Sequence, residues 1–246
     1  MGRSAAECYA ADGAAVAVMA RSQPELDATV ECLRELGAAD AVGLVTDNSD
    51  DESIRGAFAV LGERWGQLNV LINAAGPSVV GSFEDLTDEM WLSSVNVAAM
   101  GMVRCARAAL PLLRAAQWAR IVNISASSTK RQSPILVAYT AAKAVVTSVS
   151  KNLAQSLAPE GILVNTISPG PFVTTGLTTL MEHAGVDPSD LYAVMNEITK
   201  GFGHPSHIRR AGSPEEIGAV IAFVGSQRNS YMTGADINVD GGTDFC

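Results

Sequence analysis

The sequence has few of the features that mark nucleic-acid-binding, disulfide-bonded or membrane-spanning proteins. Its 246 residues carry a net charge of −9, and the Lys and Arg residues form no cluster, which argues against nucleic acid or an anionic membrane as the main partner. The four cysteines (Cys8, Cys32, Cys105 and Cys246) form no Cys-x-x-Cys pair, so reduced thiols are expected. No apolar run reaches the roughly 18 residues that a membrane span needs. We therefore predict a cytoplasmic protein.

Short apolar runs rich in β-branched residues alternate with longer helical segments along the chain. With 48% hydrophobic and 17% charged residues, the chain can bury the core of one large domain. Most runs lack an in/out alternation, as expected of strands buried on both faces of a parallel sheet. The pattern predicts a single α/β domain, residues 1–246, built on a doubly wound, Rossmann-like parallel sheet. The predicted strands are residues 14–20, 41–46, 68–73, 120–125, 162–168 and 236–239.

Several helix ends are marked in the sequence. Residues 22–25 (SQPE) and 213–216 (SPEE) have the spacing of capping boxes, and Pro214 would occupy the favoured first helical position. Gly13 and Gly37 stand where glycines commonly end helices.

Tyr139 and Lys143 are four residues apart in a stretch with a helical pattern. This spacing places both side chains on one helical face, one turn apart. A neighbouring cation favours the phenolate form and so lowers the pKa of a tyrosine, which is about 10 when free. The pair is therefore a candidate acid/base device. Alone, a tyrosine four residues before a lysine is a common coincidence.

Polar and small residues follow two of the predicted strands. Residues 73–76 (NAAG) would let a cofactor approach the backbone at the carboxyl edge of a parallel sheet. Residues 169–174 (PGPFVT) form a second such loop, in which the hydroxyl of Thr174 could meet a cofactor amide or phosphate. Asn96 is a polar residue among apolar neighbours in a helical stretch, a pattern that usually marks a structural amide.

Taken together, these residues resemble the short-chain dehydrogenase/reductase family, in particular its 3-oxoacyl reductase-like members. The resemblance runs from about residue 2 to the end of the chain. It implies that Tyr139 is the general acid/base, that Lys143 lowers its pKa and binds the nicotinamide ribose, and that Asn96 holds a water of the proton relay. The matching positions are Asp47, the 73–76 segment (Asn73, Ala74 and Gly76), Asn96, Tyr139, Lys143, Pro169, Gly170 and residues 238–242 (NVDGG).

The resemblance implies further roles in cofactor binding. Asp47 would lie beside the adenine, and Asn73 would support the sheet edge near the cofactor. At the end of the second strand of such folds, enzymes that select NAD place a carboxylate against the ribose 2′-hydroxyl. Here Ala20 is followed by Arg21 and Ser22, which could instead bind a 2′-phosphate. We therefore predict NADP(H) in preference to NAD(H).

The beginning of the sequence departs from the family. Members start with a central strand and a Gly-x-x-x-Gly-x-Gly turn that receives the pyrophosphate. Here only Gly2 and the helix that follows match. The resemblance implies that the first strand is missing, leaving a gap between the strands at 14–20 and 68–73. Either the protein starts upstream of Met1, which we favour, or the chain is a compromised product.

A second departure concerns the serine that orients the substrate oxygen in the family. Thirteen residues before Tyr139 stands Ala126, flanked by Ser125 and Ser127. A one-residue bulge would present either hydroxyl. We favour Ser127.

The leading functional hypothesis is an NADP(H)-dependent interconversion of a small-molecule ketone, of 3-oxoacyl type among others, and a secondary alcohol. The alternative is a non-catalytic scaffold that binds no dinucleotide. Residues 177–210, with His183, His204, His207 and Tyr192, are the predicted substrate lid, and no metal site is expected. By resemblance, the protein is expected to form a homo-oligomer, a dimer or a tetramer.

Overall fold

The computed structural model describes residues 1–76, 79–203 and 205–244, so the predictions that concern His204 and Cys246 lie outside the described residues. The predicted strands all form, with ends within two residues of the expected ones. The strands are β1 (Ala15–Ala20), β2 (Asp40–Val45), β3 (Val70–Asn73), β4 (Ala119–Ile124), β5 (Ile162–Pro169) and β6 (Asp236–Val239). Every pairing between them is parallel, which confirms the predicted fold class.

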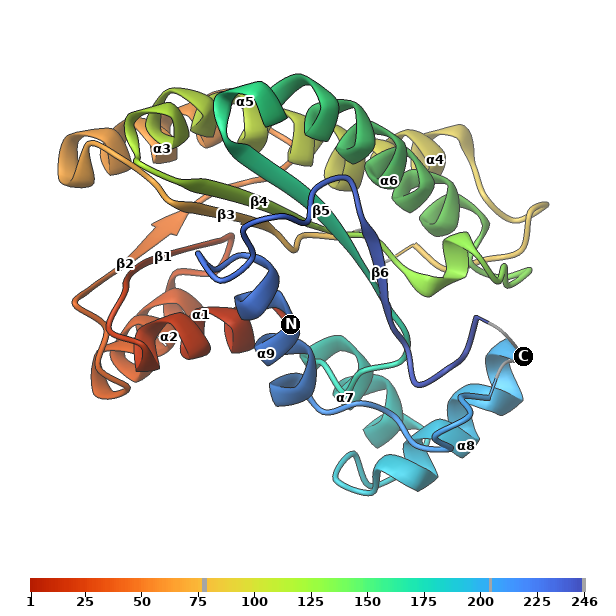
Figure 1. Ribbon diagram of the computed structural model, residues 1–246. Helices are drawn as coiled ribbons and strands as arrows, with labels where there is room; N and C mark the ends of the chain where they lie inside the picture. The colour runs from red at the N-terminus through yellow and green to blue at the C-terminus, as the bar shows by residue number, and fades with distance from the viewer. Residues whose placement is uncertain (77–78, 204, 245–246) are drawn as a thin grey trace.

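Helices cover both faces of the sheet, as a doubly wound fold requires (Figure 1). On one face lie α1 (Gly2–Ala11), α2 (Gln23–Glu35) and α9 (Pro214–Val224). On the other lie α3 (Asp51–Trp65), α4 (Asp88–Val95), α5 (Gly101–Ala115) and α6 (Val137–Leu157). A π-helical turn, Asn96–Met100, joins α4 to α5, and short 3₁₀ turns occupy Ser127–Thr129 and Ala158–Glu160. Two further helices, α7 (Thr175–His183) and α8 (Leu191–Phe202), lie beyond the carboxyl end of β5 (Figure 1).

The centre of the core is β4, all of whose residues are buried. Because successive side chains of a strand point to opposite faces, Ile121 and Val122 pack into different clusters. Ile121 joins Ile54 and Leu113 beneath α3 and α5, whereas Val122 joins Ile221 beneath α9. This burial on both faces explains why the strand sequences lack a polar face.

The sheet is divided into two parts. β1 pairs with β2 in a two-stranded sheet, and β3, β4, β5 and β6 form a four-stranded sheet in that order. β1 aligns Ala15 with Asp40 on β2, and β3 aligns Val70 with Arg120 on β4. Among the described residues no strand joins β1 to β3.

The helix-end predictions are confirmed except at one position. Gly13 and Gly37 adopt positive φ angles of 78° and 105° after α1 and α2. At α9 the capping box forms, and the Ser213 N–H donates to Glu216 Oε2 at 2.8 Å. Ser22 is the N-cap of α2 but makes no side-chain capping bond, so the box predicted at 22–25 does not form. The spacing of residues 22–25 thus predicted where α2 begins, but it did not predict the orientation of the Ser22 hydroxyl.

Within the described ranges, no helix combines the length and apolar character that a bilayer crossing requires. The same residues contain no cluster of three or more His, Cys, Asp or Glu side chains suited to a metal ion.

Candidate active site

Lys143 is held at the carboxyl edge of the sheet by two backbone carbonyls. It projects from the first half of α6, and its side chain is 3% exposed. Its Nζ donates to the carbonyl oxygen of Ile124 at 2.7 Å and to that of Ala75 at 3.4 Å. These carbonyls follow β3 and end β4, so the ammonium bridges the ends of two neighbouring strands.

Tyr139 lies one turn earlier on α6, and the Lys143 Nζ atom is 5.9 Å from the centroid of its ring. Burial raises the pKa of the Tyr139 phenol to about 12 and lowers the pKa of the Lys143 ammonium to about 8. The net shift of the Tyr139 pKa is therefore upward and caused by burial, and the lowering of this pKa by Lys143 stays a prediction.

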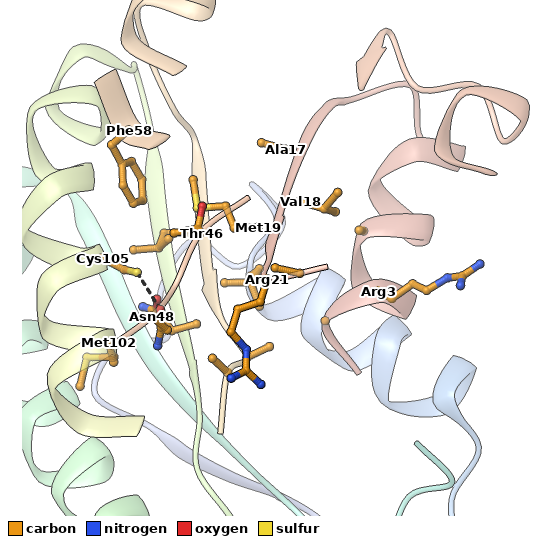
Figure 2. Close-up of a pocket in the computed structure, with 18 of the residues that line it drawn as sticks. Arg3, Ala17, Val18, Met19, Arg21, Thr46, Asn48, Phe58, Met102 and Cys105 are labelled. Carbon is orange, nitrogen blue, oxygen red and sulfur yellow. Dashed lines mark hydrogen bonds between the residues drawn. The ribbon is translucent and has the colours of Figure 1, made fainter. Parts of the chain in front are cut away.

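A cavity of about 2180 Å³ opens near this edge of the sheet, and Figure 2 shows residues that line it. The cavity begins near Arg21, at the carboxyl end of β1. It extends between β1 and β3 to Trp118, at the amino end of β4. A Cβ at Gly76, which lies in its wall, would be 3.3 Å from the Lys143 Nζ atom, so the buried lysine adjoins the cavity. The wall contains many of the predicted site residues: Gly2, Arg21, Ser22, Asp47, Asn73, Ala74, Gly76 and Asn96.

The remaining predicted site residues are not in the cavity wall: Tyr139, Lys143, Ser127, Pro169, Gly170 and Thr174. Pro169 ends β5, and Gly170 is packed against β6, where a Cβ would lie 2.7 Å from the Asp240 Cα atom. Thr174 is the N-cap of α7 without a side-chain capping bond, and its neighbour Thr175 lines the cavity. The tertiary structure therefore gives Gly170 a packing role that its sequence position alone did not reveal.

The hydroxyls around Ala126 have different surroundings. Ser125 is 1% exposed, and its Oγ is bonded to Thr147 Oγ1 at 2.7 Å and to the Lys143 carbonyl oxygen at 3.1 Å. The Ser128 Oγ is bonded to Thr140 Oγ1 at 2.9 Å. Ser127 is partly exposed at the start of a 3₁₀ turn. Ser125 and Ser128 thus serve the packing of α6, which leaves Ser127 as the candidate for substrate.

Asn96 begins the π-helical turn, and an arginine holds its side chain. Arg104 Nη1 donates to Asn96 Oδ1 at 2.8 Å, and Asn96 Nδ2 donates to the Ser49 carbonyl oxygen at 3.4 Å. The sequence analysis missed Arg104 because it lies eight residues away, beyond the usual i+3 or i+4 partners of a helix. The π-helical turn between the two residues changes the helical register.

Asn48 is a second residue that the sequence analysis missed. Its Nδ2 donates to the Val97 carbonyl oxygen at 2.8 Å, and Cys105 Sγ donates to its Oδ1 at 3.4 Å, as Figure 2 shows. A Cβ at Gly101 would lie 2.0 Å from Asn48 Nδ2, so this contact requires a glycine on α5. The two hydrogen bonds of Asn48 thus fix the loop after β2 against the π-helical turn and α5.

Asp47 and Arg21 lie at the mouth of the cavity, each after the end of a strand. Hydrogen bonds from the Ser49 hydroxyl and amide, at 2.6 and 2.8 Å, lower the pKa of Asp47, and the charge of Arg21 contributes. Arg21 is exposed and points into the opening in Figure 2. A guanidinium there can bind an anionic group of a ligand.

A chain of amides supports the floor of the site. Asn73 Nδ2 donates to Asn123 Oδ1 at 2.8 Å, and Asn123 Nδ2 donates to Ser150 Oγ at 2.8 Å. These bonds join β3, β4 and α6. The buried polar groups are thereby paired, as a site inside an apolar core requires.

The segment predicted as a lid has a small core of its own. Met181, Val194, Met195 and Ile198 are buried together between α7 and α8, whereas Tyr192 is 61% exposed. Met181 and Met195 therefore belong to this core and do not line the cavity. Of the described residues in this region, Thr175 lines the cavity and none from 177–203 or 205–210 does.

Comparisons with known proteins agree with this architecture. A family profile described as enoyl-(acyl carrier protein) reductase matches residues 1–244. The chain is 33% identical over 242 residues to the short-chain reductase protein NovJ of Streptomyces niveus, covering 98% of this chain and 89% of NovJ. It is 31% identical over 244 residues to the monensin polyketide synthase putative ketoacyl reductase of Streptomyces virginiae, with coverages of 98% and 92%.

The fold also matches solved structures. L-Sorbose reductase from Gluconobacter frateurii, complexed with NADPH and L-sorbose, superimposes with a TM-score of 0.89 at 26% identity. The match covers 100% of this chain and 92% of that protein. The fold and the site thus define an NAD(P)-dependent oxidoreductase that acts on CH–OH groups. The chain belongs to the short-chain dehydrogenase/reductase family.

Proposed function

We propose that this enzyme reduces a ketone, with 3-oxoacyl compounds among the candidate substrates, to a secondary alcohol and that it uses NADP(H). The observation that carries the proposal is the position of Lys143. Its ammonium lies under the Tyr139 ring and is bonded to carbonyls at the ends of β3 and β4, beside a cavity that reaches Arg21. The acid/base pair Tyr139 and Lys143 thus lies at the carboxyl edge of the sheet. Arg21, a cation that can bind a phosphate, lies at the same edge.

The residues of this edge fit the dinucleotide. The first amides of α1 have no capping side chain, since Met1 is the N-cap, and a helix N-terminus of this kind favours a phosphate group. Gly2 is close to the sheet, because a Cβ on it would lie 3.0 Å from the Ala74 Cβ atom. Arg21 and Ser22 would hold the 2′-phosphate, and Asp47 the adenine end. NADPH supplies a hydride when it is bound.

The chemistry of the chain itself is a proton transfer. With a pKa of about 12, the Tyr139 phenol is protonated at neutral pH and can donate to the carbonyl oxygen of the substrate as the carbonyl carbon accepts hydride. Lys143 is mostly charged at pH 7, since its pKa is about 8. Its ammonium stabilises the phenolate that this transfer leaves. Ser127 would orient the substrate oxygen, and Asn96, held by Arg104, would hold a relay water.

Replacement of Tyr139 tests the proposal. With a 3-oxoacyl thioester and a simple cyclic ketone as substrates, Tyr139→Phe should lower kcat by about 10²–10⁴-fold, the usual contribution of a general acid. NADPH affinity, measured by fluorescence titration, should change less than twofold. An active Tyr139→Phe enzyme would remove this residue from the mechanism, and lost NADPH binding would show a structural effect instead.

A second candidate, a scaffold that binds no dinucleotide, is favoured by the division of the sheet between β1 and β3. The same titration decides between the two, because a scaffold leaves NADPH fluorescence unchanged at any protein concentration.

We also propose a cytoplasmic homo-oligomer, a dimer or a tetramer. Exposed apolar side chains on the face formed by α4, the π-helical turn and α6 support this: Leu92, Met100 and Val145 are 69%, 39% and 40% exposed. Sedimentation of the purified enzyme tests the assembly.

A further inference from the structure

Two cations, Lys130 and Arg131, directly follow the short 3₁₀ turn that begins at Ser127. Their backbone N–H groups both donate to the Ser127 carbonyl oxygen, at 2.9 and 3.1 Å. Lysine and arginine side chains usually extend into water. Here the Lys130 side chain is only 29% exposed, and Arg131 is also partly buried. The positions of these two side chains therefore depend on specific partners.

Lys130 joins the turn to β6, which lies two strands away from β4 in the sheet. Its Nζ lies 3.2 Å from Asp236 Oδ2 and also donates to Asn238 Oδ1. Asp236 is 13% exposed, and its other carboxylate oxygen accepts from Ser168 Oγ of β5 at 2.6 Å. β5 and Lys130 thus each hold one oxygen of this carboxylate. Because the carboxylate neutralises the charge of Lys130, attraction of an anionic substrate is disfavoured as its role.

Arg131 makes a second attachment, to the C-terminal segment 240–244. Its Nη1 donates to the Thr243 carbonyl oxygen at 2.9 Å. The segment is stabilised by bonds of its own, because the carboxylate of Asp240 accepts from two N–H groups within it, at 2.9 and 3.1 Å. The Ser127 turn is therefore attached at two points to β6 and to the segment that follows this strand.

The same part of the chain supports two other loops of the site. The carbonyl oxygen of Val239, the last residue of β6, accepts from the Gly170 N–H in the loop after β5 at 2.9 Å. The carbonyl oxygen of Gly241 accepts from the Ile208 N–H, near the end of the predicted lid, at 3.0 Å. The Ser127 turn, the loop after β5 and the end of the lid thus share one support.

We propose that Lys130 is a positioning residue, which holds Ser127 in place for the substrate oxygen through its ion pair with Asp236. This role rests on the proposed reductase function, in which Ser127 orients that oxygen. A three-residue turn has no core of its own, so its position depends on the bonds of its flanking residues. A displacement of about 1 Å at a reacting group can cost about 10²-fold in rate. Partial burial suits the ion pair to this task, because salt screens it less than an exposed pair.

Lys130→Met tests this role, because it removes the ammonium and keeps most of the apolar stem. With a neutral cyclic ketone and an anionic 3-oxoacyl thioester as substrates, the variant should lose at least tenfold in kcat. Its NADPH dissociation constant, from fluorescence titration, should change less than twofold. Lys130→Arg keeps a cation and should restore most of the activity.

Arg114→Met is the matched control. Arg114 Nε lies 2.6 Å from Glu160 Oε2, in an ion pair that also joins segments distant in sequence. Glu160 directly precedes the start of β5, so this pair lies away from the carboxyl edge that carries the site. Arg114→Met should keep the native kcat.

A double variant separates positioning from a general structural effect. If Lys130 acts through Ser127, then Lys130→Met should cause no further loss of kcat in an enzyme that already carries Ser127→Ala. Hydrogen–deuterium exchange supplies a readout without substrate. The amides of residues 129–131, which close the turn, should exchange at least tenfold faster in Lys130→Met, while those of 119–124 in β4 should not change.

Equal losses from Lys130→Met in the native and the Ser127→Ala enzyme would overturn the proposal, as would a native kcat or unchanged exchange at residues 129–131. A loss confined to the KM of the anionic thioester and abolished by salt would make Lys130 a substrate contact and also overturn it. Failure of the proposed function gives a different result, because the native enzyme itself then reduces neither substrate.

Discussion

The Nζ atom of Lys143 lies 5.9 Å from the centroid of the Tyr139 ring and donates to the Ile124 carbonyl oxygen at 2.7 Å. The cation thus faces the ring of its partner, and its direct hydrogen bonds go to backbone carbonyls. Burial consequently moves the two pKa values in opposite directions, upward for the phenol and downward for the ammonium. This arrangement keeps the tyrosine protonated as a donor.

The first prediction concerns pH and stability. Folding lowers the pKa of Lys143 from 10.5 to about 8, so the unfolded state binds more protons between these values, and stability rises with pH in this window. Lys143→Met removes this gain. Relative to the variant, the native protein should gain about 2 kcal/mol in its free energy of unfolding between pH 8 and pH 10. Urea denaturation at several pH values measures the difference.

Tyr139→Phe is the control for this experiment. Folding raises the pKa of the phenol from 10 to about 12, so its own contribution is present below pH 10 and is lost above it. The variant should therefore keep the rise between pH 8 and pH 10. A flat difference between the native protein and Lys143→Met would mean that the lysine is not desolvated in solution.

The second prediction concerns the serine position. Ser127→Ala should lower kcat/KM by at least tenfold, about 1.4 kcal/mol, with unchanged thermal stability. Ser125→Ala should instead lower stability by about 1–3 kcal/mol, because the Lys143 carbonyl and Thr147 lose a buried partner. An unaffected Ser127→Ala enzyme together with a more active Ala126→Ser enzyme would assign the role to position 126.

The third prediction concerns the choice of cofactor. Arg21→Ala should raise the KM for NADPH by about 10–100-fold and leave that for NADH unchanged, since one charged hydrogen-bonded contact contributes about 1.5–3 kcal/mol. Arg3 is a matched control, because it also lines the cavity but is paired with Glu7 at 2.8 Å. Arg3→Ala should leave the preference as it is. A native kcat/KM higher for NADH than for NADPH would contradict the proposed role of Arg21.

The fourth prediction concerns Arg104 as a positioning residue. Its Nη1 holds Asn96 Oδ1 at 2.8 Å, so Arg104→Leu should free the amide and lower kcat about tenfold or more, with NADPH affinity unchanged. Arg104→Lys, which keeps a donor, should restore part of the activity. The kcat–pH profile separates the roles, because loss of a proton relay changes the profile whereas a purely structural defect lowers it uniformly. An unchanged kcat for Arg104→Leu would place Asn96 outside the relay.

Much of the fold could be predicted from the sequence because its signals are local. Runs of β-branched residues such as 119–124 fit strands buried on both faces, and the Ser213 box and Gly13 mark helix ends through their own backbone preferences. The Tyr139–Lys143 spacing places both groups on one helix face for the same local reason.

Only the tertiary structure decided the environment of those groups. Asn96 meets Arg104 through a π-helical turn, and Gly170 packs against Asp240, contacts that depend on register and on segments distant in sequence. The direction of the Tyr139 pKa shift follows from burial, and the carbonyls that hold Lys143 come from two other strand ends, so sequence spacing encodes neither. The sequence by itself determined which elements form and which side chains share a face. The desolvation of Tyr139 and Lys143 could be seen only in the packed fold, because it depends on all the atoms around each group. The same holds for the surroundings that distinguish the hydroxyls of Ser125 and Ser127.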